Sequence, residues 1–202
     1  MDRTAAFCTL GCKVNQYETQ AMAESMERAG YRVVDFSGAA DVYIVNSCTV
    51  TGTGDKKTRQ MVRKAHRNNP DAAIAVAGCY AQRAAAELLK LPGVRVVVGT
   101  TRKGRIASLI EDAVVTGRQV DAVEAFGREA KYEPLTVTKK PARAHAYVKV
   151  QDGCARYCSY CVIPFARGPV RSRPVEDVVR EVRTLARGGC IEVVLTGIHA
   201  AS

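Results

Sequence analysis

Short apolar runs rich in β-branched residues alternate with longer amphipathic segments through the first 120 residues of the chain. This alternation is typical of parallel α/β sheets, because a helix carries the chain back between two parallel strands. The apolar runs predict strands at residues 4–10, 31–35, 42–46, 73–77 and 94–98. The segments between them predict helices at residues 16–29, 55–67, 82–89 and 103–115. Residues 1–120 therefore predict one complete domain, an open parallel sheet of the Rossmann or flavodoxin-like type.

Residues 121–144 are polar and show little periodicity, so we expect a linker between two units. The second unit, residues 145–202, has a strand pattern at 146–150, a cysteine loop, a helix pattern at 175–187 and a strand pattern at 192–195. A closed (β/α) barrel needs roughly 200 residues or more. We therefore expect the truncated start of a (β/α) partial barrel, in a chain that is the N-terminal fragment of a longer protein.

The chain has a formal charge of +10, and the excess is concentrated in two places. Residues 56–67 contain six lysines and arginines and no acidic residue, and residues 139–173 contain eight against the single acid Asp152. Such clusters are typical of surfaces that bind a polyanion, with nucleic acid as the commonest partner. Two solvated basic faces are the alternative interpretation.

No apolar run reaches the roughly 20 residues of a membrane-spanning helix, and the N-terminus lacks the apolar core of a signal peptide. We therefore expect a cytoplasmic protein without a membrane partner. Thiols stay reduced in that compartment, so the eight cysteines are expected to serve as ligands rather than to form disulfides.

Cys154, Cys158 and Cys161 form a CxxxCxxC pattern on the loop that leaves the first strand of the second unit. Three thiolates on one short loop can hold three irons of a 4Fe-4S cluster and leave the fourth iron without a protein ligand. A structural zinc site needs a fourth ligand, usually from a second pair nearby, and this loop offers none. With Tyr160 directly before the last cysteine, the pattern resembles the radical SAM superfamily. The resemblance implies that the open iron binds S-adenosylmethionine (SAM), with Tyr160 beside it.

Cys12, Cys48 and Cys79 each follow a predicted strand of the first unit. The carboxyl ends of parallel strands meet at one edge of a sheet, where ligands collect. The sequence therefore predicts a second cluster at this edge, with inert buried cysteines as the alternative. Cys8 and Cys190 fall outside both patterns, and we expect them to pack in the interior.

Four motifs resemble, in this order, those of the radical SAM methylthiotransferases: TLGCKVNQYET at 9–19, NSCTVT at 46–51, AGCYAQ at 77–82 and CARYCSYC at 154–161. The resemblance runs from about residue 4 to the end of the chain. It implies an auxiliary 4Fe-4S cluster, involved in supplying sulfur, on Cys12, Cys48 and Cys79. It implies a second 4Fe-4S cluster, the one that binds SAM, on Cys154, Cys158 and Cys161.

Residues 11–16 and 150–154 look most like the branch that adds a methylthio group to C2 of N6-threonylcarbamoyladenosine, beside the anticodon of tRNA. Two other branches, for isopentenyladenosine in tRNA and for an aspartate of a ribosomal protein, carry different residues after the first motif cysteine. A different class of protein is also left open. It is a non-catalytic nucleic-acid-binding module whose cysteines hold structural zinc.

The resemblance also implies contacts outside the cysteines. We expect Arg167, Arg171 and Arg173 to position substrate RNA or the SAM carboxylate, with solvated or intramolecularly paired arginines as the alternative. Thr196 and Gly197 end the second strand of the barrel, where the superfamily places a glycine motif that contacts SAM. Most of the barrel and the family's C-terminal TRAM-type RNA-binding domain are absent from the sequence, so we expect these 202 residues alone to bind clusters without activity.

Overall fold

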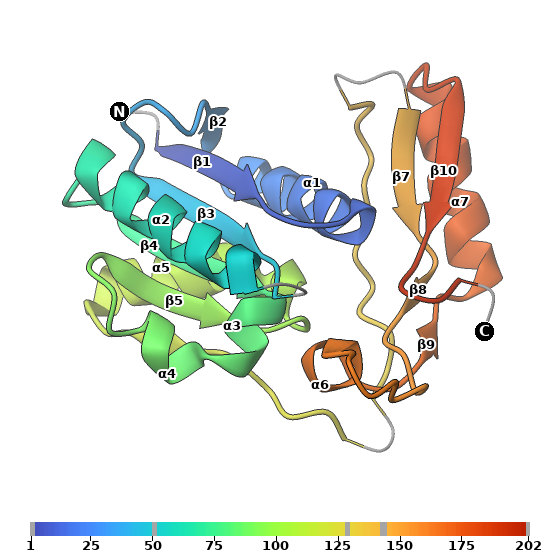
Figure 1. The fold of residues 1–202 in the computed structure, drawn as a ribbon. Helices are drawn as coiled ribbons and strands as arrows, with labels where there is room; N and C mark the ends of the chain where they lie inside the picture. Colours follow the sequence, from blue (N-terminus) through green and yellow to red (C-terminus); the bar gives the residue numbers. More distant parts are fainter. Residues whose placement is uncertain (1–2, 50–51, 128–129, 142–144, 201–202) are drawn as a thin grey trace.

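The structure, a computed structural model, describes residues 3–49, 52–127, 130–141 and 145–200. A six-stranded parallel sheet with the order β2-β1-β3-β4-β5-β6 forms the first unit (Figure 1). Its strands are β1 (Thr4–Thr9), β2 (Arg32–Val34), β3 (Val42–Ser47), β4 (Ala73–Gly78), β5 (Val94–Val98) and β6 (Val120–Asp121). The strand order reverses between β1 and β3, because β2 lies on one side of β1 and the later strands lie on the other.

Helices cover both faces of this sheet (Figure 1). One face carries α1 (Lys13–Arg28) and α5 (Ile106–Thr116), with the short helix η1 (Lys103–Arg105) before α5. The other carries α2 (Gly52–Asn68), α3 (Cys79–Arg83) and α4 (Ala85–Leu88). Successive strand residues point to opposite faces, so Ile44 packs in the cluster of Met26 whereas Val45 packs in the cluster of Val62. Each such side chain stabilises the fold by roughly 1.5–3 kcal/mol through burial.

The α/β prediction for the first unit is confirmed, and each predicted strand lies within one residue of its observed bounds. The single helix predicted at 82–89 is wrong. The helix begins earlier, at Cys79, and breaks at Ala84, whose φ of −137° is not helical. Strand β6, which pairs with β5, was not predicted because its two residues are too few to show a period.

The second unit is built on two parallel strands, β7 (His145–Lys149) and β10 (Glu192–Thr196), joined through α7 (Val175–Arg187). This strand–helix–strand order agrees with the predicted start of a (β/α) barrel. Between β7 and α7 lie β8 (Gln151–Asp152), α6 (Ile163–Arg167) and β9 (Arg171–Ser172), and β8 pairs antiparallel with β9. Within the described ranges, no helix is long and apolar enough to span a membrane.

Residues 130–141 form a strap that runs between α1 and the second unit (Figure 1). The carboxylate of Glu24 on α1 accepts hydrogen bonds from the backbone N–H groups of Thr138, at 2.9 Å, and Lys139, at 3.0 Å. Leu135 and Val137 are buried in one apolar cluster with residues of α1, β7 and α7. The segment predicted as a linker therefore packs along α1 and joins the two units.

Candidate functional site

Three adjacent strands of the sheet each lead into a cysteine. Cys12 follows β1 and precedes the first turn of α1, Cys48 follows β3, and Cys79 follows β4 and begins α3. Because β1, β3 and β4 are neighbours, the three residues lie at the same edge of the sheet. The strand order reverses between β1 and β3 at this edge, which is where open α/β sheets bind ligands.

The glycines before Cys12 and Cys79 allow the three loops to approach closely. Gly11 has a φ of +104°, and a Cβ atom there would lie 2.8 Å from the Cβ of Cys48. Gly78 has a φ of +99°, and a Cβ atom there would lie 2.5 Å from the carbonyl oxygen of Ser47. Both positions require glycine for the backbone conformation and for space.

Asn15, in the first turn of α1, holds these loops in place and is fully buried. Its side-chain amide donates to the carbonyl oxygens of Leu10, at 2.7 Å, and Ser47, at 2.9 Å. Its side-chain oxygen lies 3.9 Å from the Cys12 sulfur and accepts a hydrogen bond of 2.6 Å from Arg167. One side chain thus fixes the ends of β1 and β3 and contacts the second unit.

The three thiols differ in exposure. Cys12 is exposed, Cys48 is partly buried and Cys79 is buried. Burial raises the pKa of the Cys79 thiol, while the positive charges of Arg167 and Lys103 act in the opposite direction. Among the residues that the structure describes, no three Cys, His, Asp or Glu side chains lie close enough together to hold a metal ion. The structure therefore places this cysteine trio at one edge of the sheet.

The other cysteine trio lies on the loop between β8 and α6. The backbone N–H of Cys154 donates to the carbonyl of Gly168 at 3.0 Å, so the loop closes onto the end of α6. Cys161 donates to the carbonyl of Cys158 at 2.9 Å. Tyr160 is 90% exposed, and its ring is available for contact with a ligand.

Thr196 and Gly197 lie beside the strand that leads into this loop. The carbonyl of Thr196 accepts a hydrogen bond of 2.9 Å from the backbone N–H of Val150. The side-chain oxygen of Gln151 accepts hydrogen bonds from the backbone N–H groups of Ile198, at 2.9 Å, and His199, at 2.8 Å. Sequence reasoning missed Gln151, because a single glutamine in a strand pattern carries no ligand signal.

The three arginines predicted to contact RNA or SAM lie inside the protein. Arg171 donates to the carbonyl oxygen of Arg167 at 2.8 Å, and Arg173 forms an ion pair of 2.5 Å with Glu181. Arg167 is fully buried and forms ion pairs with Glu18, at 3.0 Å, and Asp152, at 2.9 Å. The structure thus shows these arginines paired within the protein, which was the alternative to contact with RNA or SAM. Contact with RNA or SAM stays a prediction.

Around Arg167, a buried charge cluster joins the two units. We use this name for Glu18, Lys103, Lys149, Asp152, Arg167 and Arg171. Lys149 lies 2.8 Å from both Glu18 and Asp152, and Lys103 forms a further ion pair with Glu18. Although burial acts in the opposite direction, the cations hold the pKa values of Glu18 and Asp152 below their ordinary values.

The buried charge cluster carries more positive than negative charge. Its four cations exceed its two carboxylates by two, and by one when the carboxylate of Glu133, on which Lys103 and Lys149 act, is counted as well. Within the described ranges the Nε atoms of Arg167 and Arg171 are buried without a hydrogen-bond partner. Unpaired buried donors and uncompensated positive charge favour an anion nearby. A cluster held by three thiolates, one of them Cys79 beside Arg167, fits this requirement.

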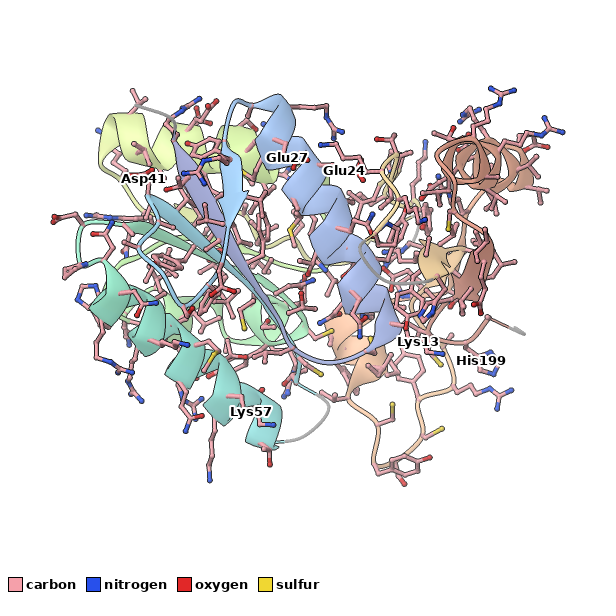
Figure 2. All side chains as sticks on the ribbon, turned by 90° about the horizontal axis from the view of Figure 1, so that it is seen from above. Lys13, Glu24, Glu27, Asp41, Lys57 and His199 are labelled. Atoms are coloured by element: carbon pink, nitrogen blue, oxygen red, sulfur yellow. The ribbon has the colours of Figure 1, made fainter. Side chains whose placement is uncertain are left out.

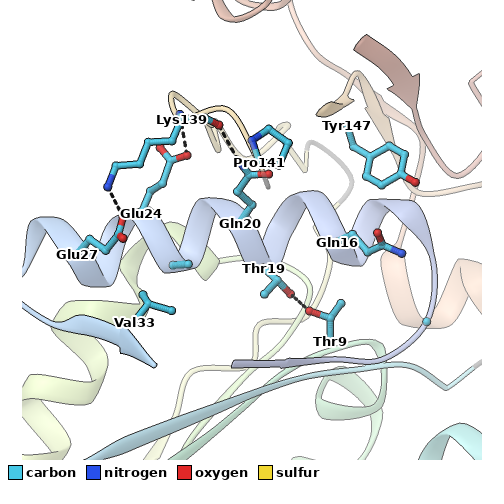
Figure 3. A pocket seen from close by; sticks show the side chains of 12 residues that line it. Thr9, Gln16, Thr19, Gln20, Glu24, Glu27, Val33, Lys139, Pro141 and Tyr147 are labelled. Atoms are coloured by element: carbon cyan, nitrogen blue, oxygen red, sulfur yellow. Dashed lines mark hydrogen bonds and ion pairs between the residues drawn. The ribbon is translucent and has the colours of Figure 1, made fainter. Parts of the chain in front are cut away.

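A groove of about 860 Å³ lies along α1 (Figure 3). It runs between α1 and the strap, and an ion pair of 2.6 Å between Lys139 and Glu27 closes one end. Figure 2 shows Glu24 and Glu27 toward one end of α1 and Lys13 at the other, beside the second unit. None of the predicted ligand cysteines lines the groove, but Gly11, directly before Cys12, does, so the groove reaches the first cysteine loop.

Family models match two parts of the chain. Residues 4–99 match "Uncharacterized protein family UPF0004", and residues 148–201 match the radical SAM superfamily. These two regions contain all six cysteines of the two predicted trios.

Curated relatives match nearly the whole chain. It is 46% identical to the threonylcarbamoyladenosine tRNA methylthiotransferase MtaB of Bacillus subtilis, over 97% of this chain and 44% of that protein. It is 41% identical to the protein of the same name from Aquifex aeolicus, over 95% of this chain and 47% of that one. It is 33% identical to the tRNA-2-methylthio-N(6)-dimethylallyladenosine synthase of Sulfurihydrogenibium, over 94% of this chain and 44% of that protein. The chain thus spans less than half the length of these relatives. By its two matched regions and these relatives, the chain belongs to the radical SAM methylthiotransferase family.

Proposed function

We propose that the chain carries the two iron–sulfur sites of a cytoplasmic tRNA methylthiotransferase. Its substrate is N6-threonylcarbamoyladenosine beside the anticodon, and its product is the 2-methylthio derivative. The observation that carries this proposal is the 46% identity with the Bacillus subtilis protein over 97% of the chain. Identity with the dimethylallyladenosine synthases of four other bacteria is 31–36%, below the 46% and 41% found with the two threonylcarbamoyladenosine enzymes, which favours the threonylcarbamoyl branch.

In this proposal the two cysteine trios are the cluster ligands. Cys12, Cys48 and Cys79 hold an auxiliary 4Fe-4S cluster at the sheet edge, and Cys154, Cys158 and Cys161 hold the SAM cluster. When bound, the clusters and SAM supply the radical and sulfur chemistry that activates an aromatic C–H bond. The protein contributes the thiolates, their spacing and the surrounding charge.

Several residues of the chain orient these sites. Asn15 fixes the loop ends before Cys12 and Cys48 through its two amide hydrogen bonds. Gln151 holds the backbone that follows Thr196 and Gly197, which we place against SAM together with Tyr160. Oriented ligands lower the entropy that is lost when a substrate or cofactor binds.

For tRNA, α2 offers a basic surface. Lys56, Lys57, Arg63 and Arg67 are exposed on it, and Figure 2 shows Lys57 on its outer side. Exposed lysines and arginines bind phosphates independently of sequence, and this binding weakens as salt rises. We therefore assign phosphate contact to α2 ahead of the buried arginines of the second unit.

The first test is anaerobic reconstitution with iron and sulfide, followed by iron counting and EPR. About eight irons are expected in the wild type, and about four after either trio is changed to alanine. A wild type that holds about four irons, lost in only one triple variant, would contradict the two-cluster assignment. Zinc without iron would favour the non-catalytic module instead.

The substrate is tested with the full-length protein in a strain that lacks the threonylcarbamoyl-specific enzyme. Mass spectrometry of tRNA nucleosides should show the 2-methylthio derivative of N6-threonylcarbamoyladenosine. If the methylthio group appears on isopentenyladenosine, or on a ribosomal protein, the branch assignment is wrong.

A further inference from the structure

Arg167 contacts both sides of the boundary between the two units. It lies at the end of α6, is fully buried, and donates to Asn15 at 2.6 Å and to Glu18 at 3.0 Å, both on α1. On its own side it donates to Asp152 at 2.9 Å. Asn15 in turn holds the loop ends before Cys12 and Cys48, so Arg167 is one hydrogen bond removed from both of those loops.

Arg167 also lies beside the third cysteine. Helix α6 contacts α3, whose first residue is Cys79, and the Arg167 guanidinium acts electrostatically on that thiol. The Nε–H of Arg167 is buried without a partner in the described part of the chain. A cation with an unused donor beside a cysteine is the arrangement by which proteins tune the sulfur ligands of a cluster.

We infer that Arg167 is a positioning residue of the auxiliary cluster, which orders the three cysteine loops and raises the cluster's reduction potential through its positive charge. This inference rests on the proposed auxiliary cluster. Reduction adds negative charge, and a nearby cation stabilises the reduced form more than the oxidised form. The excess of positive charge in the buried charge cluster acts in the same direction.

The test uses the chain with Cys154, Cys158 and Cys161 changed to alanine, so that only the auxiliary cluster remains. Three proteins are compared: this parent, which keeps Arg167, and its Arg167→Lys and Arg167→Gln variants. We measure the iron content of each, and its midpoint potential by an anaerobic redox titration monitored by EPR. The glutamine variant should have a lower potential than the parent. The lysine variant keeps the charge, so its potential should lie closer to that of the parent.

Arg173→Gln is the matched control, because Arg173 is also buried and paired but with Glu181 and Tyr17 instead of the cysteine loops. Its potential should equal that of the parent. Equal shifts in Arg167→Gln and Arg173→Gln would indicate general loosening and would overturn the inference, as would an unchanged potential in Arg167→Gln.

If Arg167→Gln loses its iron, the lysine variant decides the question. Restored iron with a potential near that of the parent supports the inference, and failure to restore either one overturns it. If the parent protein, which keeps only Cys12, Cys48 and Cys79 as cluster ligands, binds no iron, the proposed auxiliary cluster is wrong and this inference is overturned with it. An intact cluster with an unchanged potential would overturn this inference alone.

Discussion

The hydroxyl of Tyr17 on α1 lies 3.2 Å from a carboxylate oxygen of Glu181 on α7, across the boundary between the two units. The same hydroxyl lies 2.6 Å from the carbonyl oxygen of Leu135 in the strap, and Arg173 donates to it at 3.2 Å. Three segments far apart in the sequence therefore meet at one buried phenol. Burial and the adjacent Glu181 carboxylate raise its pKa, so it stays protonated as a donor.

Tyr17→Phe removes this donor and takes away the hydrogen bond to the buried carbonyl oxygen of Leu135, while Glu181 keeps its ion pair with Arg173. We expect the free energy of unfolding to fall by about 1–3 kcal/mol, as measured by urea denaturation. Tyr160→Phe is the control, because Tyr160 is 90% exposed and its change should stay within about 0.5 kcal/mol. Equal effects of the two substitutions would contradict the structural role of Tyr17.

Glu18→Gln removes a carboxylate that three buried cations share. Removing one partner of a buried ion pair lowers the free energy of unfolding by about 3–5 kcal/mol, because the remaining charges stay desolvated. We expect a loss of this size in the iron-free protein, measured by chemical denaturation. Glu111→Gln breaks an exposed pair with Arg3 and should cost no more than about 1 kcal/mol.

Gly78→Ala tests the close approach of β4 to the end of β3. The new Cβ would lie 2.5 Å from the Ser47 carbonyl oxygen, at a φ of +99°. Gly117→Ala is a matched control, because its φ is also positive, +66°, but nothing lies within 4 Å. The control should cost about 1–2 kcal/mol from backbone strain alone. Gly78→Ala should cost more in thermal or urea unfolding and should lower iron retention by the Cys79 trio.

Asp41 gives a pH dependence that is independent of the cysteine sites. The side chain and backbone N–H of Thr4 both donate to its carboxylate at 2.7 Å and lower its pKa. A lowered pKa in the folded state stabilises the protein above the unfolded value, about 3.9, and this stabilisation is lost as pH falls through the folded value. The stability difference between wild type and Asp41→Asn should therefore be constant from pH 7 to pH 5 and shrink below about pH 4.

Thr4→Val checks the cause of that effect. It removes the side-chain donor and keeps the backbone N–H, so it should weaken the acid dependence without abolishing it. Urea denaturation at each pH gives the stability of all three proteins. An Asp41→Asn difference that stays constant down to pH 3 would contradict the assignment.

The sequence predicted the strands because each is a short run of β-branched or small apolar residues, and it predicted the common edge because parallel strands end together. It did not predict the buried charge cluster. Glu18 and Arg167 are 149 residues apart, and no local pattern links them. A basic residue near a cysteine loop looks the same in sequence whether it contacts RNA or a buried carboxylate. The break at Ala84 was missed for a similar reason, since no glycine or proline marks it.

The strap has a consequence for how the molecule unfolds. Tyr17 and Ala21 of α1 share one apolar cluster with Leu135 and Val137 of the strap and with β7 of the second unit. If the second unit separated from the first, that apolar face of α1 would be exposed to water. We therefore expect one cooperative transition in differential scanning calorimetry, with the calorimetric and van't Hoff enthalpies equal, where two independent domains would melt in two steps. A protease cut inside residues 131–138 should leave two pieces that co-elute in size-exclusion chromatography. Side-chain contacts hold the two units together as well as the peptide chain that connects them.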